Sequence, residues 1–161
     1  MFVNPTHDLY RQPWAVSLHG GHSGEYCDHG HGTLRETVEA AAARGYVVFG
    51  VTEHAPRVEP RFLFAEERAR GWDVAKLERD FAEYAAAVRA LADEYADRLT
   101  VLCGFEAEVV PADRYPALMR GYQSQYGFDY MVGSVHWVDE VIVDYTRESF
   151  EQAVTDQGTL E

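Results

Sequence analysis

The sequence has few cysteines, few basic residues and no long hydrophobic run, and each shortage excludes a class of protein. Cys27 and Cys103 are its only cysteines, too few for a disulfide framework and typical of a reducing compartment. No segment approaches the roughly 20 apolar residues that a membrane-spanning helix needs. Lys and Arg total 14 against 27 Asp and Glu, and the resulting net charge of -13 disfavours binding to a nucleic-acid backbone.

The first residues, MFVNPTHDLYRQPW, lack the apolar core of a signal peptide, so we expect a cytoplasmic protein. Repeats, low-complexity blocks and linker-like segments are missing too. With 161 residues, 47% of them hydrophobic, the chain is expected to form a single domain over residues 1–161. The acidic balance does not exclude a small phosphorylated substrate, because bound cations can reverse the local field.

One short segment, SLHGGHSGEYCDHGHGTL at residues 17–34, carries four of the seven histidines. Glycines lie between them, and glycine lets the backbone approach other groups closely. A loop rich in histidine and glycine is typical of metal binding, although a chance concentration of histidines stays an alternative at this point.

Short apolar runs alternate with segments of helical periodicity along the chain. Strands are expected at residues 15–18, 46–52, 99–105 and 130–135, and helices at 33–44, at 114–126 and from 73 onward. Residues 55–72 are expected to form a long loop, and residues 141–143 a short extra strand. A further helix is expected to start at residue 148. This alternation predicts an α/β fold with a parallel sheet.

The longest predicted helix begins at Asp73 and carries one apolar stripe, which is typical of core packing rather than of a cofactor site. The stripe consists of Leu77, Phe81, Tyr84, Val88, Leu91 and Tyr95.

Histidine or glutamate follows each of the four predicted strands. In chain order these residues are His19 and His22, then Glu53 and His54, then Glu106 with Glu108 near it, and then His136. The carboxyl ends of parallel strands meet at one edge of the sheet, so these side chains should converge there. Polar residues commonly follow strands, but this does not explain why the choice is His or Glu each time. The pattern favours a metal site.

Four segments resemble, in order and spacing, the polymerase-and-histidinol-phosphatase (PHP) superfamily, and within it the histidinol-phosphate phosphatases. They are HGGHSGEYCDHGHGTL, VVFGVTEHAPR, GFEAEVVP and FDYMVGSVHWVD, and the resemblance extends over residues 16–144. The resemblance implies a distorted seven-stranded (β/α) barrel with a cluster of two or three metal ions at its C-terminal face. The chain would supply about the first four β/α units.

The resemblance also implies the ligands. His22 and His29 match histidines of the first motif, and His54, Glu106 and His136 match the ligands after the second, third and fourth strands. We expect His22, His54, Glu106 and His136 to take part in catalysis. Histidine nitrogen with carboxylate oxygen suits Zn, Fe or Mn. Arg57 is placed to contact a substrate phosphate, with an ordinary surface arginine as the alternative. Cys27 is expected to pack beside His29, with a soft metal ligand as the alternative, and His31 is expected to be exposed.

Two features depart from the family pattern. Gly20 stands where the first motif usually has a histidine, so His19 is expected to take that ligand position through the flexible glycine pair at 20–21. The alternative is that this ligand is lost. A closed barrel typically needs about 250 residues, and the late Gly-His and Asp-x-His motifs are absent from this sequence. The chain therefore looks like the N-terminal half of such an enzyme, with an open sheet edge that could pair with a complementary C-terminal half or with a second copy.

The resemblance implies a metal-dependent hydrolase that converts L-histidinol phosphate and water to L-histidinol and phosphate. One alternative is a PHP phosphoesterase acting on another phosphorylated substrate. Another is an inactive metal-binding fragment that needs a partner half. Nucleic-acid and membrane partners are not expected, because no basic, aromatic face and no apolar span occur in the sequence.

Overall fold

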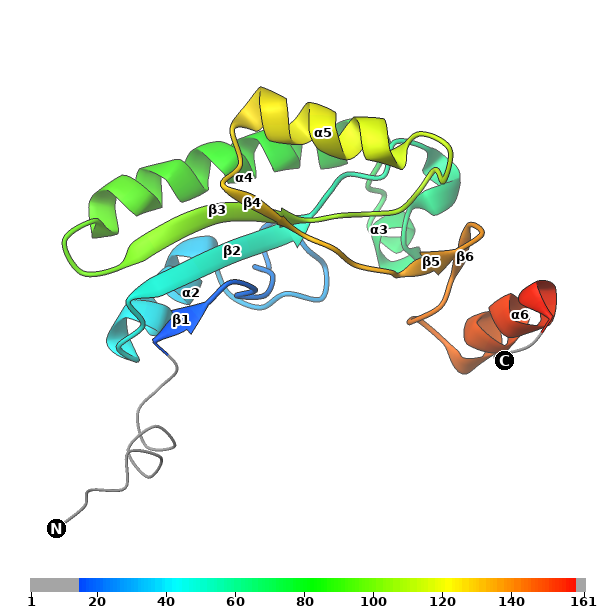
Figure 1. Cartoon of the computed structure of the whole chain (residues 1–161), viewed down its shortest axis with the longest axis horizontal. Helices are drawn as coiled ribbons and strands as arrows, with labels where there is room; N and C mark the ends of the chain where they lie inside the picture. Colours follow the sequence, from blue (N-terminus) through cyan, green and yellow to red (C-terminus); the bar gives the residue numbers. More distant parts are fainter. Residues whose placement is uncertain (1–14, 159–161) are drawn as a thin grey trace, which may run out of the picture.

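The computed structural model describes residues 15–158, and its centre is a curled four-stranded parallel sheet (Figure 1). Its strands lie side by side in chain order: β1 (Val16–Ser17), β2 (Val48–His54), β3 (Thr100–Glu106) and β4 (Tyr130–Val132). All three pairings are parallel. The α/β prediction is therefore confirmed, and the sheet forms about half of a barrel.

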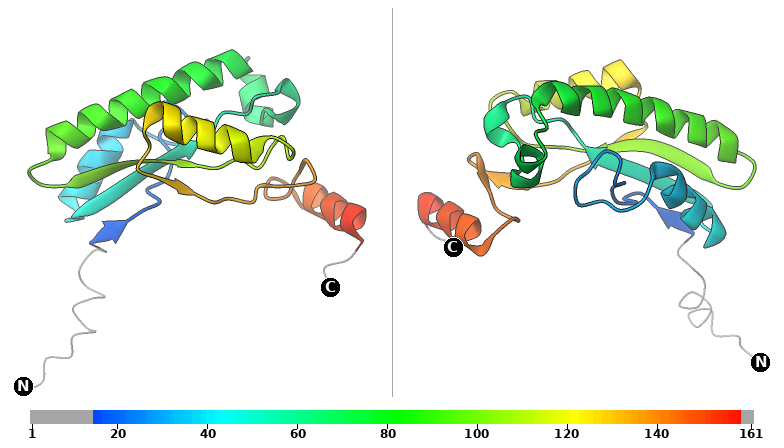
Figure 2. Two further views of the ribbon diagram at one scale, coloured as in Figure 1. Left: turned by 45° about the horizontal axis from the view of Figure 1, so that its top comes forward. Right: turned by 180° about the vertical axis from the view of Figure 1, so that it is seen from behind.

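Helices pack against one face of this sheet, where α4 and α5 lie next to each other (Figures 1 and 2). Their bounds are α2 (Leu34–Ala43), α4 (Val74–Tyr95) and α5 (Tyr115–Tyr126). Thr33 and Glu36, three residues apart, form a capping box at the start of α2. Asp73 caps α4 by accepting a hydrogen bond from the backbone N–H of Lys76 at 2.7 Å.

The apolar stripe of α4 forms the middle of the core, as its spacing predicts. All six residues of the stripe are buried. The ring of Phe81 lies 5.1–6.2 Å, centroid to centroid, from five aromatic rings of α4, α5, β3 and the segment before β4. The Tyr84 hydroxyl lies 2.8 Å from the carbonyl oxygen of Val51 and 2.7 Å from that of Gly104, so it ties α4 to both central strands.

On the opposite face of the sheet, the Tyr130 ring lies against two glycines of the central strands. A Cβ atom on Gly104 would lie 2.4 Å from this ring, and one on Gly50 would lie 2.0 Å from its hydroxyl oxygen. Only glycine therefore fits at these two strand positions. No helix within residues 15–158 covers this face (Figure 1), and Val16 and Leu18 stay about half exposed.

The segment 55–72 differs from the predicted long loop, because it contains a 3-10 helix, η1 (Pro60–Phe62), and a short helix, α3 (Ala65–Ala69). Glu67 explains the turn into α3: its carboxylate accepts a hydrogen bond from the Phe64 N–H at 2.8 Å and also pairs with Arg57. Periodicity could not show this helix, which is only five residues long.

The end of the described chain also departs from the prediction. Strand β4 stops at Val132 rather than at residue 135. β5 (Trp137–Val138) and β6 (Val141–Ile142) form a separate antiparallel pair, followed by α6 (Arg147–Gln157), which lies apart from the main sheet (Figure 1). None of the helices between residues 15 and 158 is long and apolar enough to cross a membrane.

Replacing Phe81 by Ala should lower the free energy of unfolding by about 3–5 kcal/mol, because a buried aromatic ring leaves a cavity when removed. Urea unfolding followed by circular dichroism would measure this change. Glu83→Ala, on the exposed side of the same helix, is the control and should change stability by less than about 0.5 kcal/mol. A Phe81→Ala change as small as that of the control would contradict the packing described for α4.

Candidate metal centre

The register of β2 and β3 brings the predicted ligands together at one edge of the sheet. The two strands pair over seven residues, and the last pair places His54 opposite Glu106. On the other side of β3, Val132 of β4 lies beside Glu106, and the chain then leads to His136. His22 reaches the same point from the loop after β1. Convergence at the carboxyl ends of the strands is therefore a feature of the structure.

Glu106 is the centre of the cluster. Its carboxylate oxygens lie 3.3 Å from His22 Nε2, 3.3 Å from His136 Nε2 and 3.6 Å from His54 Nδ1. The Ser134 hydroxyl also donates a hydrogen bond to it. The side chain is 7% exposed, so three rings from three different segments surround a nearly buried carboxylate.

Two further carboxylates, not among the predicted ligands, lie behind the histidines. Glu53 Oε2 is 3.3 Å from His22 Nδ1, and Glu108 Oε1 is 3.0 Å from His54 Nδ1 and 3.4 Å from His136 Nδ1. Both residues are almost fully buried. The sequence pattern predicts that both converge at this edge of the sheet, although it names neither as a ligand.

His29 joins the cluster from the histidine-rich loop. Its Nε2 lies 3.4 Å from His54 Nε2, and its ring centroid is 5.1 Å from that of His22. Cys27 is buried and its sulfur lies 3.2 Å from the His29 ring nitrogen, in agreement with the predicted packing role. Burial raises the pKa of this thiol to about 11, so it stays protonated at neutral pH.

His19 lies at the rim of the site rather than at its centre. Its Nε2 is 4.0 Å from Glu106 Oε1, while its Nδ1 lies 2.6 Å from the Thr52 hydroxyl. The side chain is 49% exposed. The backbone N–H of Gly20 donates to the carbonyl of Gly50 at 2.9 Å, so the glycine after His19 continues the pairing with β2.

Arg57 does not face the site as a phosphate ligand would, and it is not a surface arginine either. Its side chain is 3% exposed, pairs with Glu67, lies 3.7 Å from Glu108 Oε1 and stacks on Phe64 at 4.3 Å. The sequence predicts either a phosphate ligand or a surface arginine, and each would place the guanidinium in contact with substrate or solvent. The structure instead commits it to buried carboxylates beneath the histidines.

A cavity of about 370 Å³ opens above the cluster. Its lining consists of His19, His22, His29, His54, Phe64, Glu66, Glu106, His136, Ile142, Asp144 and Tyr145. The segment predicted as a loop thus supplies one wall, through Phe64 and Glu66. A volume of this size suits a small metabolite.

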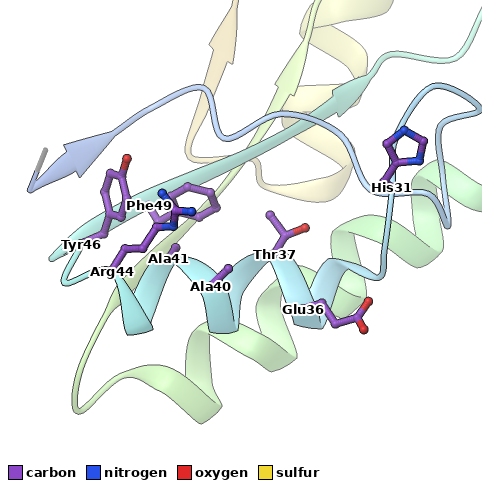
Figure 3. Close-up of a pocket in the computed structure, with 8 residues that line it drawn as sticks. All are labelled: His31, Glu36, Thr37, Ala40, Ala41, Arg44, Tyr46 and Phe49. Carbon is purple, nitrogen blue, oxygen red and sulfur yellow. The ribbon is translucent and has the colours of Figure 1, made fainter. Parts of the chain in front are cut away.

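His31 lies outside the metal cluster and is exposed, as predicted. It lines a second cavity, of about 390 Å³, that runs along α2 between Glu36 and Tyr46 (Figure 3). Glu36 there is already engaged in capping α2.

The residues of the cluster fit divalent metal ions. Five buried atoms lack a hydrogen-bond partner: His22 Nδ1, His54 Nδ1, Glu53 Oε2, Glu106 Oε2 and Glu108 Oε1. Buried polar atoms without partners are costly, and a cation among nitrogen and carboxylate ligands removes that cost. Two groups of ligand atoms, from His22, His29 and His54 and from His54, Glu106 and His136, each lie within 4.8 Å of one another. A set of imidazoles and a carboxylate suits Zn, Fe or Mn.

Without metal, the carboxylates hold protons on two of the rings. Burial by itself lowers the pKa of His22, but Glu106 and Glu53 outweigh it and raise that pKa to about 9. Glu106 and Glu108 raise the pKa of His136 to about 10. Burial alone would raise the pKa of Glu106, but its neighbours His136, His22 and Ser134 hold it well below its usual range.

The PHP domain family matches residues 18–160. The chain belongs to the PHP family. The match includes all four strand ends that carry the cluster, and the predicted resemblance is therefore confirmed.

Histidinol phosphatases are among the PHP proteins that this chain is similar to. It is 33% identical over 144 residues to the "probable histidinol-phosphatase" of Schizosaccharomyces pombe, covering 89% of this chain and 45% of that protein. It is 28% identical to the histidinol-phosphatase of Saccharomyces cerevisiae, covering 82% of this chain and 42% of that protein. The chain thus spans about half the length of the curated relatives it matches.

A solved structure agrees with the fold. A candidate histidinol phosphatase from Listeria monocytogenes superposes with a TM-score of 0.59 at 21% identity, covering 81% of this chain and 54% of that chain. At this identity the likeness supports the partial barrel and nothing finer.

Metal binding should release protons, because His22 and His136 are protonated at neutral pH in the metal-free protein and a metal ion needs their lone pairs. Since both pKa values are raised, the apparent affinity should keep rising as pH increases toward about 9–10, instead of levelling off near the ordinary histidine value of about 6.5. Zn²⁺ calorimetry at pH 7.5 in buffers of different ionisation enthalpy should show about two protons released. Binding with no proton release would contradict this charge state.

Proposed function

We propose that this chain is the metal-binding part of a phosphomonoester hydrolase that converts L-histidinol phosphate and water to L-histidinol and phosphate. The observation that carries the proposal is Glu106, a buried carboxylate surrounded by histidines from separate strand ends. The similarity to yeast histidinol phosphatases supports the substrate class. Residues 1–161 would form one PHP domain of a cytoplasmic enzyme.

The residues that would hold two or three ions of Zn, Fe or Mn are His19, His22, His29, His54, Glu106 and His136. Bound ions would supply Lewis acidity toward phosphate oxygens and a nucleophilic water at neutral pH. Glu106 directs one oxygen toward His136 and the other toward His22, and would supply carboxylate ligation beside both rings.

The chain's own groups would bind and orient the substrate. Phe64, Ile142 and Tyr145 give the cavity an apolar wall, which excludes water from one side of the reacting phosphate. Glu66 and Asp144 lie in the same lining and place negative charge there. These carboxylates would repel a simple phosphate dianion but attract the ammonium group of L-histidinol phosphate. The lining therefore favours an amine-bearing phosphate ester.

The open sheet supports the need for a partner. Parallel sheets are normally covered on both faces, yet Val16 and Leu18, in and just after β1, are 47% and 50% exposed. A complementary C-terminal half would continue the sheet from β4 and cover this face, and a second copy of the chain is the other candidate. The alternative of an inactive metal-binding fragment applies to the chain without such a partner.

The isolated chain should hydrolyse L-histidinol phosphate at least about a thousandfold more slowly than a complete enzyme of this type, a loss of roughly 4 kcal/mol in transition-state stabilisation. Mixing it with a polypeptide carrying the remaining part of the S. pombe relative should restore part of the rate. His136→Ala should abolish the restored activity, and His31→Ala, which changes an exposed histidine outside the site, should not. Full turnover by a verified monomer would overturn the need for a partner.

Substrate choice is tested with a set of phosphate esters assayed on the reconstituted pair. L-Histidinol phosphate and other amino-alcohol phosphates should be hydrolysed at least about tenfold more efficiently, in kcat/KM, than esters of similar size without an amine. Asp144→Asn should raise KM more for the amine-bearing esters than for the others, because the ammonium loses its partner, whereas losing the 3.7 Å contact with His136 would affect all esters alike. Equal rates on all esters would favour a PHP phosphoesterase with another substrate.

A further inference from the structure

Three histidines of the cluster are oriented in the same way. The Nδ1 atoms of His22, His54 and His136 each face a carboxylate behind the cluster, at 3.3, 3.0 and 3.4 Å. Their Nε2 atoms face other predicted ligands: Glu106 for His22 and His136, and His29 for His54. The three rings come from separate segments and share this orientation. A common set of contacts on their Nδ1 side would explain it.

The carboxylates behind the rings are Glu53 and Glu108, and neither lines the cavity. Their side chains are 4% and 0% exposed. The cavity is lined instead by the three histidines and by Glu106. An ion that enters through the cavity therefore meets Nε2 atoms first and the two carboxylates last.

Both carboxylates are held by their other oxygen. Glu53 Oε1 accepts hydrogen bonds from the backbone N–H of Ser23 at 2.7 Å and from the Ser23 hydroxyl at 2.9 Å. Glu108 Oε2 accepts a hydrogen bond from the Trp137 indole N–H at 3.1 Å. Oε1 has no hydrogen-bond partner, and Arg57 lies 3.7 Å from it. One oxygen of each is fixed, so the other has a defined direction.

The free oxygens and the ring nitrogens form matched pairs. Glu53 Oε2 and His22 Nδ1 both lack a hydrogen-bond partner, as do Glu108 Oε1 and His54 Nδ1. Within each pair the two atoms lie 3.3 and 3.0 Å apart. Each of these carboxylate oxygens is thus the nearest acceptor for a proton on the Nδ1 atom that it faces.

We infer that Glu53 and Glu108 are positioning residues that hold the Nδ1–H of His22, His54 and His136 and so turn each Nε2 lone pair toward the cavity. The inference rests on the proposed metal function. A buried carboxylate behind a ligating histidine fixes the tautomer and ring orientation, and its loss typically costs about 10- to 100-fold in metal affinity. The rival arrangement makes Glu53 itself a ligand, with His22 and Cys27, whose ligand atoms lie within 4.8 Å of one another.

The first test measures the Zn²⁺ affinity of Glu53→Gln and Glu108→Gln by competition with a chelator. Both variants should bind Zn²⁺ about 10- to 100-fold more weakly than the unchanged chain. The control is Glu67→Gln, which alters an equally buried carboxylate that contacts Arg57 and the Phe64 N–H but no histidine. It should lower thermal stability while keeping the affinity within about threefold. Gln variants that bind as tightly as the unchanged chain, or a control that loses as much as they do, would overturn the inference.

The second test reads the tautomers directly. Long-range ¹H–¹⁵N spectra of the Zn²⁺-loaded chain should show His22, His54 and His136 protonated at Nδ1 and bound through Nε2. Zinc bound to Nδ1 of His22 or His54 would overturn the inference and favour the rival site with Glu53. A chain that binds no Zn²⁺ at all would overturn the proposed metal function itself.

Two milder variants keep the test decisive if a Gln variant does not fold. Trp137→Phe removes the indole N–H that holds Glu108, and Ser23→Ala removes one of the two hydrogen bonds to Glu53. Each should weaken Zn²⁺ binding about 2- to 10-fold, the range expected for one hydrogen bond. Affinities unchanged in both variants would also count against the positioning role.

Discussion

The parallel register between β2 and β3 is the constraint on which the rest of the structure depends. It sets His54 opposite Glu106 at the last of seven paired positions. A slip of one residue would turn one strand's side chains to the other face, sending Glu106 into the helix-covered core and Phe105 toward the site. The register of β3 with β4 in turn places Tyr130 beside Gly104, and its ring extends across to Gly50 of β2.

The sequence predicts the parts of the site that follow from strand periodicity, and misses those that depend on tertiary contact. His22, His54, Glu106 and His136 could be assigned because the ends of parallel strands must converge. Arg57 could not, because nothing local shows that α3 folds back to bury it against Glu67. Strand β4 ends early for a similar reason: residues beyond Val132 leave β3 for a hairpin that pairs only with itself.

Burying three carboxylates in one cluster imposes an energetic condition on a chain that is already strongly acidic. Glu53, Glu106 and Glu108 are each 5% exposed or less, and like charges so close together repel unless cations lie among them. In the metal-free chain protonated histidines and Arg57 provide that positive charge. Divalent ions would replace the ring protons and would likewise supply positive charge that offsets the carboxylates. The composition that disfavours nucleic acid thus also makes this site depend on cations.

The ligands lie far apart in the chain, and this dispersion has a mechanical consequence. Ions shared by residues from four successive β/α units would crosslink segments that are otherwise joined only through packing, and closing such long loops restricts the unfolded chain. The crosslink would tie only the carboxyl ends of the strands. At their opposite ends, near Val48 and Thr100, the loaded protein would have no such restraint, so its unfolding would begin there. Unlike a disulfide, this metal crosslink would be removed by a chelator and would need no reductant.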